Sequence, residues 1–255
     1  MSAGLAPKLE DYSRKYQCVR LNRKNGILEV RFHTGGGSMK WGPIPHRELG
    51  YLFADIAEDL DNEAVIITGE GSDFCTGMDI GTFDMSPKGW ELLRQEGRRL
   101  INNLLDIQVP VIGVVNGPAH IHAELVLLSN IVICTPEATF KDLPHFPGGA
   151  VPGDGVHVVW PALLGPTRGS YFLLTGQVLS AQQAQTLGVV NEIVARDQLM
   201  TRAWAIAEDI VKRTPMVRRY SRILLTQEMK RLMHDHLSHG LTLEALAGMD
   251  MVQGR

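Results

Sequence analysis

Two histidines one residue apart, His120 and His122, stand in the turn "NGPAHIHAEL", between an apolar run and an apolar helical pattern. Such turns usually carry small residues, because the backbone passes close to other groups. A neutral imidazole at this place can donate a hydrogen bond to an enolate or transfer a proton. The positive end of the following helix disfavours an imidazolium, so we expect His122 to be neutral. The alternative is a histidine that only caps the helix.

The same pair of histidines raises the question of a metal site. At the start of a helix the two side chains point about 200° apart. No carboxylate or cysteine completes a ligand set at a suitable spacing. The segment "HDH" at residues 234–236 is excluded by the same argument. We therefore expect no metal ion.

Two carboxylates stand in unusual surroundings. Asp154 lies between two glycines in "VPGDG", and Glu244 interrupts an otherwise apolar helical face in "LTLEALAGM". A carboxylate in a glycine-rich turn is usually a turn residue. A carboxylate on an apolar face is either solvated or a buried base with a raised pKa. The residues alone leave both alternatives open.

Strands and helices alternate along the first two thirds of the chain. Residues 19–33 predict a hairpin, with Asn25 and Gly26 supplying the positive φ angles of its tight turn. Helical spacing follows at residues 46–60 and 87–106, and short β-branched runs lie at 63–71, 109–117 and 130–137. This alternation predicts the α/β class, a sheet with both faces covered.

The C-terminal part of the chain is almost wholly helical in pattern. Ser180 is placed to cap a short helix that Gly188 ends, and a strand-like "VVNEIV" follows. From residue 197 onward the pattern is helical and is broken at Thr214-Pro215. We therefore place a core at residues 1–195 and a helical region at residues 196–255.

The composition is that of an ordinary globular protein. Of 255 residues, 44% are apolar and 21% charged, and the net charge of −3 gives no support for nucleic acid or an anionic membrane as partner. The three cysteines are odd in number and lie in apolar stretches, which favours reduced thiols in the core. No apolar run approaches the roughly 20 residues of a membrane span, and the first residues lack the apolar segment of a signal peptide. We expect a cytoplasmic protein.

Four stretches together resemble the crotonase, or enoyl-CoA hydratase/isomerase, superfamily. They are "GEGSDFCTGMDI" at 69–80, "VPVIGVVNGPAHIHAEL" at 109–125, "ATFKDLPHFPGGAVPGDGV" at 138–156 and "GPTRGSYFLLTGQVLSAQQAQTLGVVNEIV" at 165–194. Each is weak alone, but the order and spacing of all four are specific. The resemblance implies a spiral of ββα units with a C-terminal helical trimerisation region, in a homotrimer or a dimer of trimers.

Three departures from the family set this chain apart. Two backbone amides form the family's oxyanion hole, and by position they would belong to Met78 and Ile121, but the family's glycine triplet is here His120-Ile121-His122. The family's P-x-x-x-N-A-L segment is replaced by "HTGGGSMKWGPIPHREL", and the basic and aromatic segment near the C-terminus is absent. All three lie where the family holds a CoA ester, so they favour a small substrate without CoA.

A narrower resemblance covers the replaced positions. Trp41, His46, the "HAE" that begins at His122, "PHFP" around His145, "VPGDG" and "HVVWP" are similar to 6-oxocamphor hydrolase and related β-diketone hydrolases. In that branch, water opens a non-enolisable cyclic β-diketone in a retro-Claisen reaction that passes through an enolate. The resemblance implies a small diketone as partner, and no metal or organic cofactor.

The resemblance also implies roles for single residues. A pair formed by His122 and Asp154 would orient a proton donor and protonate the enolate. His145 would hydrogen-bond a carbonyl together with the indole N–H of Trp41, in place of the two backbone amides or beside them. The catalytic water would be bound and activated by Glu244 and His46.

Two other classes of function stay open at this point. One is a CoA-ester hydratase or isomerase. Of its two catalytic glutamates, Glu124 aligns with one, and His145 takes the place of the other. The second is a catalytically silent member that serves as a scaffold or binds RNA, which the absence of a basic surplus disfavours.

Overall fold

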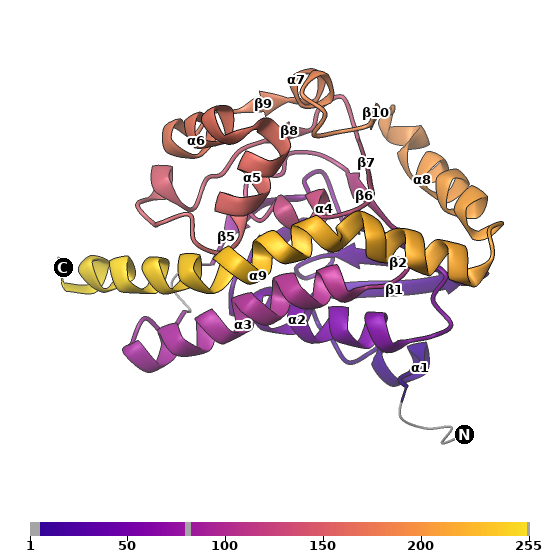
Figure 1. The fold of residues 1–255 in the computed structure, drawn as a ribbon, viewed down its shortest axis with the longest axis horizontal. Coiled ribbons are helices and arrows are strands. Elements are labelled where there is room, and N and C mark those ends of the chain that lie inside the picture. The colour runs from indigo at the N-terminus through magenta and orange to yellow at the C-terminus, as the bar shows by residue number, and fades with distance from the viewer. Residues whose placement is uncertain (1–5, 80–82, 254–255) are drawn as a thin grey trace.

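A six-stranded sheet forms the frame of the protein in the computed structural model, which describes residues 6–79 and 83–253 (Figure 1). Its strand order is β1-β2-β4-β6-β7-β10, with β1 and β2 antiparallel and the others parallel. The predicted hairpin is confirmed, since Asn25 and Gly26 have φ angles of 52° and 76°. The strands are β1 Val19–Lys24, β2 Ile27–Phe32, β4 Ala64–Gly69, β6 Val111–Val115, β7 Ile131–Cys134 and β10 Glu192–Ile193.

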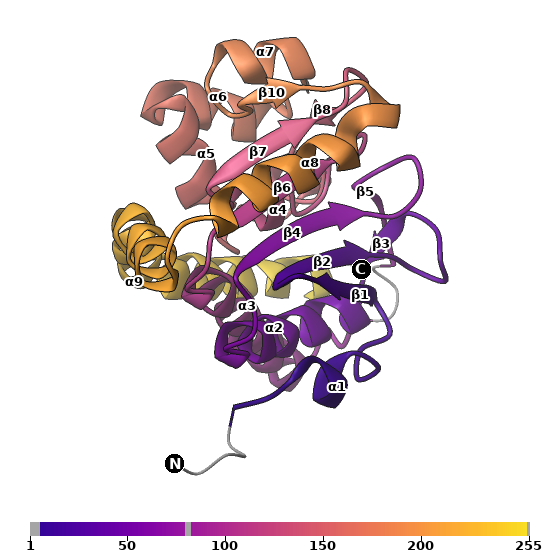
Figure 2. The ribbon, with the colours of Figure 1, turned by 90° about the vertical axis from the view of Figure 1, so that its right-hand side faces the viewer.

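Helices cover both faces of this sheet, as Figure 2 shows. Side chains alternate between faces along a strand, so Val65 and Ile67 of β4 pack in the core that includes α2 (Pro43–Glu58) and α3 (Pro87–Asp106). Ala64 and Ile66 pack on the other side, with Leu199 of α8 (Arg196–Val211). Burial on both faces explains why β4 and β6 are continuous apolar runs. The predicted α/β class is confirmed.

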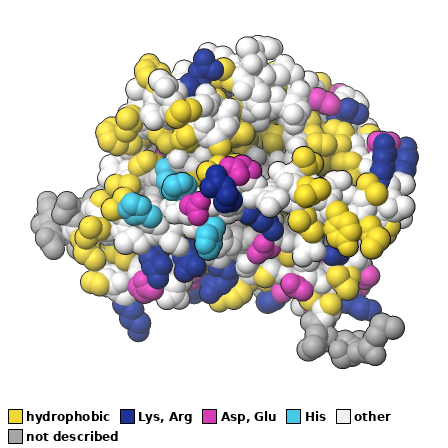
Figure 3. Space-filling view, in the orientation of Figure 1, with side chains coloured by type: hydrophobic (Ala, Val, Ile, Leu, Met, Phe, Trp, Pro, Cys, Tyr) yellow, Lys and Arg dark blue, Asp and Glu magenta, His cyan; other side chains and the backbone are white. Residues whose placement is uncertain are grey.

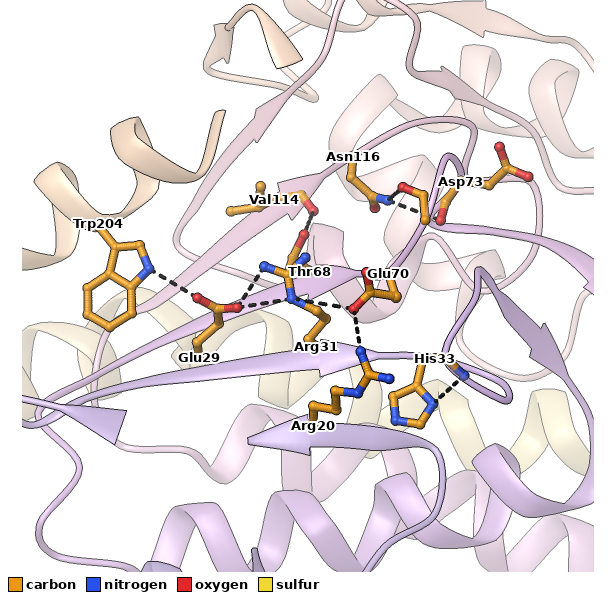
Figure 4. A network of polar contacts seen from close by, with 12 residues as sticks. Arg20, Glu29, Arg31, His33, Thr68, Glu70, Asp73, Val114, Asn116 and Trp204 are labelled. Atoms are coloured by element: carbon orange, nitrogen blue, oxygen red, sulfur yellow. Dashed lines mark hydrogen bonds and ion pairs between the residues drawn. The ribbon is translucent and has the colours of Figure 1, made fainter. Parts of the chain in front are cut away.

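Polar contacts also connect α8 to the sheet (Figure 4). The indole of Trp204 donates to Glu29 Oε2 at 3.1 Å. Glu29 in turn accepts from Arg31 of the same strand, and Glu70 accepts from Arg20 at 3.2 Å. Although residue 196 is the start of α8, this helix completes the core of the sheet and is not separate from it. The division into a core at residues 1–195 and a helical region at residues 196–255 stays a prediction.

Short strands form a second layer beside the main sheet. β3 (Met39–Trp41) pairs with β5 (Cys75–Met78), β8 (Thr139–Phe140) pairs with β9 (Leu179–Ser180), and Ala119 bridges Cys75 to Phe140. Successive turns of the chain thus give one strand to the main sheet and then one to the second layer. This is the expected spiral of ββα units, and it sets Trp41 directly beside Met78.

The remaining helices are α1 and α9 near the two ends of the chain and several short helices between them, of which α7 packs against β8 and β9. Ser180 caps α7 by accepting from Gln183 N, and α9 begins at Pro215, as predicted. Helices α5 and α6 had not been predicted. The elements are α1 Leu9–Tyr12, α4 Glu124–Leu127, the 3₁₀ turn Phe146–Gly148, α5 Val156–Leu164, α6 Pro166–Thr175, α7 Ala181–Thr186 and α9 Pro215–Gln253.

The cysteines and helices bear on the predicted class of protein. Cys18, Cys75 and Cys134 are free and buried, which confirms the expected core thiols. Within the described ranges, no helix is both long enough and apolar enough to cross a lipid bilayer.

Arg222 fixes the long helix α9 to the rest of the fold. Its side chain is 1% exposed. The guanidinium donates to the carbonyl oxygens of Ile107, Leu128 and Leu104 at 3.2–3.4 Å and to Asn130 Oδ1 at 3.1 Å. Burial lowers the pKa of Arg222 to about 10. Acceptors at the end of α3 and between α4 and β7 therefore depend on one side chain.

We expect Arg222→Met to lower the free energy of unfolding by about 3 kcal/mol, because the buried acceptors lose their donor. Urea unfolding followed by circular dichroism measures this change. The control is Lys230→Met, which removes an exposed ion pair to Asp106 and should cost less than about 1 kcal/mol. Equal losses in the two variants would contradict the role of Arg222.

Candidate active site

Helix α3 and the second half of α9 run side by side (Figure 1). Residues of both helices line a cavity of about 280 Å³. Its lining combines large apolar side chains with several polar groups that converge from distant parts of the chain. This combination is typical of a small-molecule site. Its polar or aromatic-polar residues are Trp41, His46, Trp90, Arg94, His122, His145, Asp154 and Glu244.

His122 is held in a backbone conformation that favours glycine. Its φ angle is 50°, and this left-handed region costs a side-chain-bearing residue about 1–2 kcal/mol. The ring stacks on Trp41, with centroids 3.7 Å apart and planes at 34°. The other histidine of the pair, His120, contacts Thr139 Oγ1 at 2.8 Å and is not in the lining. The chain therefore keeps a strained imidazole in the cavity at a position where glycine would fit without strain.

Imidazoles and carboxylates alternate along one side of the cavity. Asp142 Oδ1 lies 2.7 Å from His145 Nδ1, and His145 Nε2 lies 3.3 Å from Asp154 Oδ2. The same Asp154 oxygen lies 3.4 Å from His122 Nδ1, which contacts Glu124 Oε1 at 2.6 Å. The exposed fraction of each of the five side chains is 11% or less. Asp154 thus joins the two histidines, while Asp142 and Glu124 each orient one of them.

The charges of these alternating imidazoles and carboxylates shift one another's pKa values. Burial alone would lower the pKa of His145, but the charge of Asp154 and the hydrogen bond to Asp142 outweigh burial and raise it well above the usual value. Burial would raise the pKa of Asp154, but the two histidines outweigh it and lower that pKa. Burial raises the pKa of Glu124. We conclude that an ionised Asp154 lies between two imidazoles that favour the protonated state.

The expectation of a neutral His122 is wrong for this reason. Burial does lower the pKa of His122, but the nearby charges of Glu124 and Asp154 outweigh it, so the pKa is raised. The helix that follows is α4, only four residues long, and its small dipole is a weaker influence than two carboxylates in contact.

The expectation that no carboxylate completes a ligand set at a suitable spacing is corrected for His122. One ligand atom from each of His122, Glu124 and Asp154 lies within 4.8 Å of the others. However, the same histidine nitrogen faces both acids, and 2.6 Å to Glu124 is a hydrogen-bond length. Atoms that each bind one ion at about 2 Å lie about 3 Å or more apart. The geometry fits a shared proton better than a metal ion.

Glu244 reaches this group because two glycines allow α9 to approach. A Cβ built at Gly153 would overlap the carbonyl oxygen of Gly240, and a Cβ at Gly240 would overlap that of Gly153. The contact places Glu244 of α9 beside the turn that carries Asp154. Its Oε2 is buried without a hydrogen-bond partner in the described part of the chain. Burial, and then the charge of Asp154, raise the pKa of Glu244 to about 8.

Of the two residues predicted to supply the amides of an oxyanion hole, one lines the cavity and the other does not. Met78 lines the cavity beside Trp41. Ile121 does not line it, and its amide donates to the carbonyl oxygen of Cys75 at 3.2 Å. This contradicts the predicted substrate contact of Ile121, because its N–H is already engaged within the fold.

The sequence reasoning missed three polar groups at the site. Asp142 orients His145, Glu96 accepts from His46, and Arg94 is among the residues that line the cavity. Glu96 could have been found from its position on the apolar stripe of α3, and its side chain is indeed only 4% exposed. A carboxylate on an apolar stripe is the signal that drew attention to Glu244.

The pattern of the enoyl-CoA hydratase/isomerase family matches residues 41–251. The chain belongs to this family. Among curated members it is 29% identical over 202 residues to a carnitinyl-CoA dehydratase of Proteus mirabilis, covering 78% of this chain and 77% of that protein. A carnitinyl-CoA dehydratase of Shigella flexneri is 30% identical over 210 residues, with 78% and 77% covered.

Solved structures of the family include a nearer neighbour. A β-diketone hydrolase from the cyanobacterium Anabaena sp. PCC 7120, bound to (S)-3-oxocyclohexyl acetic acid, is 43% identical with a TM-score of 0.93, over 94% of this chain and 98% of that one. An enoyl-CoA hydratase/isomerase from Mycobacterium paratuberculosis is 25% identical with a TM-score of 0.85, over 91% and 94%. The fold of the family, with its long C-terminal helix, is therefore shown for this chain.

Proposed function

We propose that this protein opens a cyclic, and specifically a bicyclic, β-diketone with water by a retro-Claisen reaction. The observation that carries the proposal is the strained His122, stacked on Trp41 and joined through Asp154 to His145. These side chains supply protonated donors in a cavity of about 280 Å³, which suits a small ketone. The 43% identity to a β-diketone hydrolase supports the same reading.

The ligand of that neighbour indicates the class of substrate. (S)-3-oxocyclohexyl acetic acid has the atoms of bicyclo[2.2.2]octane-2,6-dione plus one water. Attack of water on one carbonyl, followed by cleavage of its bond to the shared bridgehead carbon, gives this acid. The cleaved carbonyl becomes the carboxyl group, and the other remains the ring ketone. Because the dione has two equivalent carbonyls, formation of one enantiomer requires an enzyme that distinguishes them.

The site residues can divide this reaction among them. His46 takes a proton from water as the oxygen adds to one carbonyl, and Glu244, protonated below pH about 8, hydrogen-bonds that water. The carbon–carbon bond then breaks, and its electron pair passes to the other carbonyl as an enolate. Donors preorganised in a buried site stabilise such an anion by several kcal/mol.

The alternating imidazoles and carboxylates would stabilise and protonate the enolate. His145 and the indole N–H of Trp41 hydrogen-bond its oxygen, and His122, oriented by Asp154, returns a proton to carbon. Water gives one proton to His46 and His122 gives one to carbon, so a proton must then pass from His46 to His122 through solvent to restore the starting state. The net reaction adds water and needs no electron donor or acceptor.

The curated relatives favour a second candidate, hydration or dehydration of a CoA ester. Two contacts oppose it. The amide of Ile121, which would complete the family's oxyanion hole, is bonded to Cys75, and Glu124, a family catalytic position, is bonded to His122. Both groups would have to leave their partners to act on a thioester.

We also propose that copies of the chain assemble into a trimer or a dimer of trimers. The first half of α9 exposes a group of apolar side chains, and hydrophobic side chains gather on the right of the face shown in Figure 3. A face of this kind is expected to be covered by protein. Its exposed members are Met216, Val217, Tyr220, Leu224 and Leu225.

The proposed function is tested with purified protein, chelator present and no added cofactor. We expect bicyclo[2.2.2]octane-2,6-dione to be converted to keto acid and crotonyl-CoA to remain unchanged. His122→Asn should reduce turnover of the dione at least a hundredfold, and it should fold, because Asn tolerates positive φ. Hydration of crotonyl-CoA without turnover of any diketone would overturn the proposal. Loss of turnover on chelation would instead show that the reaction needs a metal ion, for which His122, Glu124 and Asp154 are the candidate ligands.

A further inference from the structure

Glu96 is a buried carboxylate that the reaction described so far does not use. It lies on α3 and contacts His46 of α2, with Oε2 3.0 Å from His46 Nδ1. The two side chains are 4% and 12% exposed. Its other oxygen accepts from Arg47 Nε at 2.7 Å. Each oxygen of Glu96 therefore accepts a hydrogen bond, one from His46 and the other from Arg47, which are neighbours on α2.

We propose that Glu96 is a positioning residue that keeps His46 in the tautomer required of the base. This inference rests on the proposed function, since it concerns how the site prepares water for attack on the diketone. It adds to the site a second histidine–carboxylate unit, which connects α2 to α3 and includes none of the residues that join Asp142 to Glu124.

The ionised state of Glu96 is required for this role. Burial would raise the pKa of Glu96, but the hydrogen bonds from His46 and Arg47 outweigh it, and the pKa is lowered. A carboxylate without a proton can only accept. The proton between the two residues therefore belongs to Nδ1 of His46, which leaves the lone pair on Nε2.

The surroundings of the ring hold Nε2 available to the cavity. His46 lines the cavity, and its Nε2 has no hydrogen-bond partner within the residues that the structure describes. Trp41 and Phe83 meet the ring edge to face, each with a centroid distance of 5.9 Å. The ring is fixed by Glu96 on one side and by two aromatic rings, and Nε2 is the nitrogen left to accept a proton from water.

Loss of the Glu96 charge would release this arrangement. In Glu96→Gln the amide can donate to Nδ1, which favours the tautomer with hydrogen on Nε2. A histidine in that tautomer has no lone pair facing the water. The same reasoning explains the importance of the carboxylate in serine–histidine–aspartate triads.

The test is ¹⁵N NMR of histidine-labelled protein, with the His46 signals assigned by their loss in His46→Asn. We expect wild type at neutral pH to show hydrogen on Nδ1 and an unprotonated Nε2, and Glu96→Gln to show the reverse. Asp106→Asn is the matched control, since it removes one carboxylate and one ion pair from the same helix. Its His46 signals should equal those of wild type.

Turnover of the dione provides the second readout. We expect kcat of Glu96→Gln to fall about a hundredfold with KM within about threefold of wild type, while Asp106→Asn keeps wild-type values. Hydrogen on Nε2 in wild type, or one tautomer in both proteins, would overturn the inference. The NMR result stands whether or not diketones are substrates, so it separates failure of this inference from failure of the proposed function.

Discussion

Asp154→Asn is expected to lower kcat for the dione about a thousandfold or more. One oxygen of Asp154 lies 3.3 Å from His145 and 3.4 Å from His122, so the substitution removes the anion shared by both imidazoles. The pKa of His145 should fall, because the charge of Asp154 is the main influence that opposes burial there. The pKa of His122 should fall less, because Glu124 opposes burial more strongly than Asp154 does and is still present. Losses of this size follow when groups that act as a unit are broken.

Steady-state kinetics on the dione and thermal unfolding measure this prediction together. Asn and Asp have similar volumes, so the folded variant should keep its circular dichroism spectrum. Asp235→Asn, which loses an exposed ion pair with Arg231, serves as the control and should keep full activity. Retention of more than about a tenth of wild-type kcat by Asp154→Asn would show that the chain of imidazoles does not depend on its central carboxylate.

Activity is expected to fall about tenfold per pH unit above pH about 8, the pKa of Glu244. Below that pH the carboxyl group is neutral and can donate a hydrogen bond. Above it, ionisation would put a second negative charge beside Asp154 and remove the donor. The pKa is raised from its ordinary 4.5, so folded-state stability should also decline as pH rises from about 4.5 to 8.

Glu244→Gln distinguishes a donor from a base at this position. Glutamine keeps a donor but does not ionise, so we expect this variant to retain activity and to lose the decline above pH 8. The pH dependence of kcat/KM in both proteins measures this. A wild-type rate that increases through pH 8, together with an inactive Glu244→Gln, would show that ionised Glu244 is the base.

Local sequence signals predicted most elements of the fold. The Asn25-Gly26 turn, the helix at 87–106 and the cap at Ser180 depend on residues within a few positions of each other, and all three are present. Helix α5 was missed because "VHVVWPALL" is apolar on nearly every position, so it has no polar face to reveal a helical period.

The site was predicted only in part, because its geometry depends on distant contacts. His46 and Glu96 lie 50 residues apart, and no local pattern connects them. The approach of Glu244 to Asp154 depends on the contact of Gly153 with Gly240. The resemblance, and not periodicity or composition, supplied the roles proposed for these positions.

The wrong expectation about His122 has the same origin. Its charge depends on Glu124 and on Asp154, which lies 32 positions further along the chain (154 − 122). The sequence shows Glu124 two positions away, but not that its oxygen lies 2.6 Å from the ring or that α4 is short. The left-handed conformation of His122 likewise becomes visible only in the folded backbone, although the family's glycine at this position is consistent with it.

The most direct test of the central claim is hydrolysis of bicyclo[2.2.2]octane-2,6-dione in ¹⁸O-labelled heavy water, with the product analysed at early times by mass spectrometry and chiral chromatography. A retro-Claisen reaction at this site predicts one solvent oxygen in the carboxyl group, one deuterium on the carbon beside the ketone, and one enantiomer in excess. Unchanged dione, or a racemic acid formed at the rate seen without protein, would contradict the account.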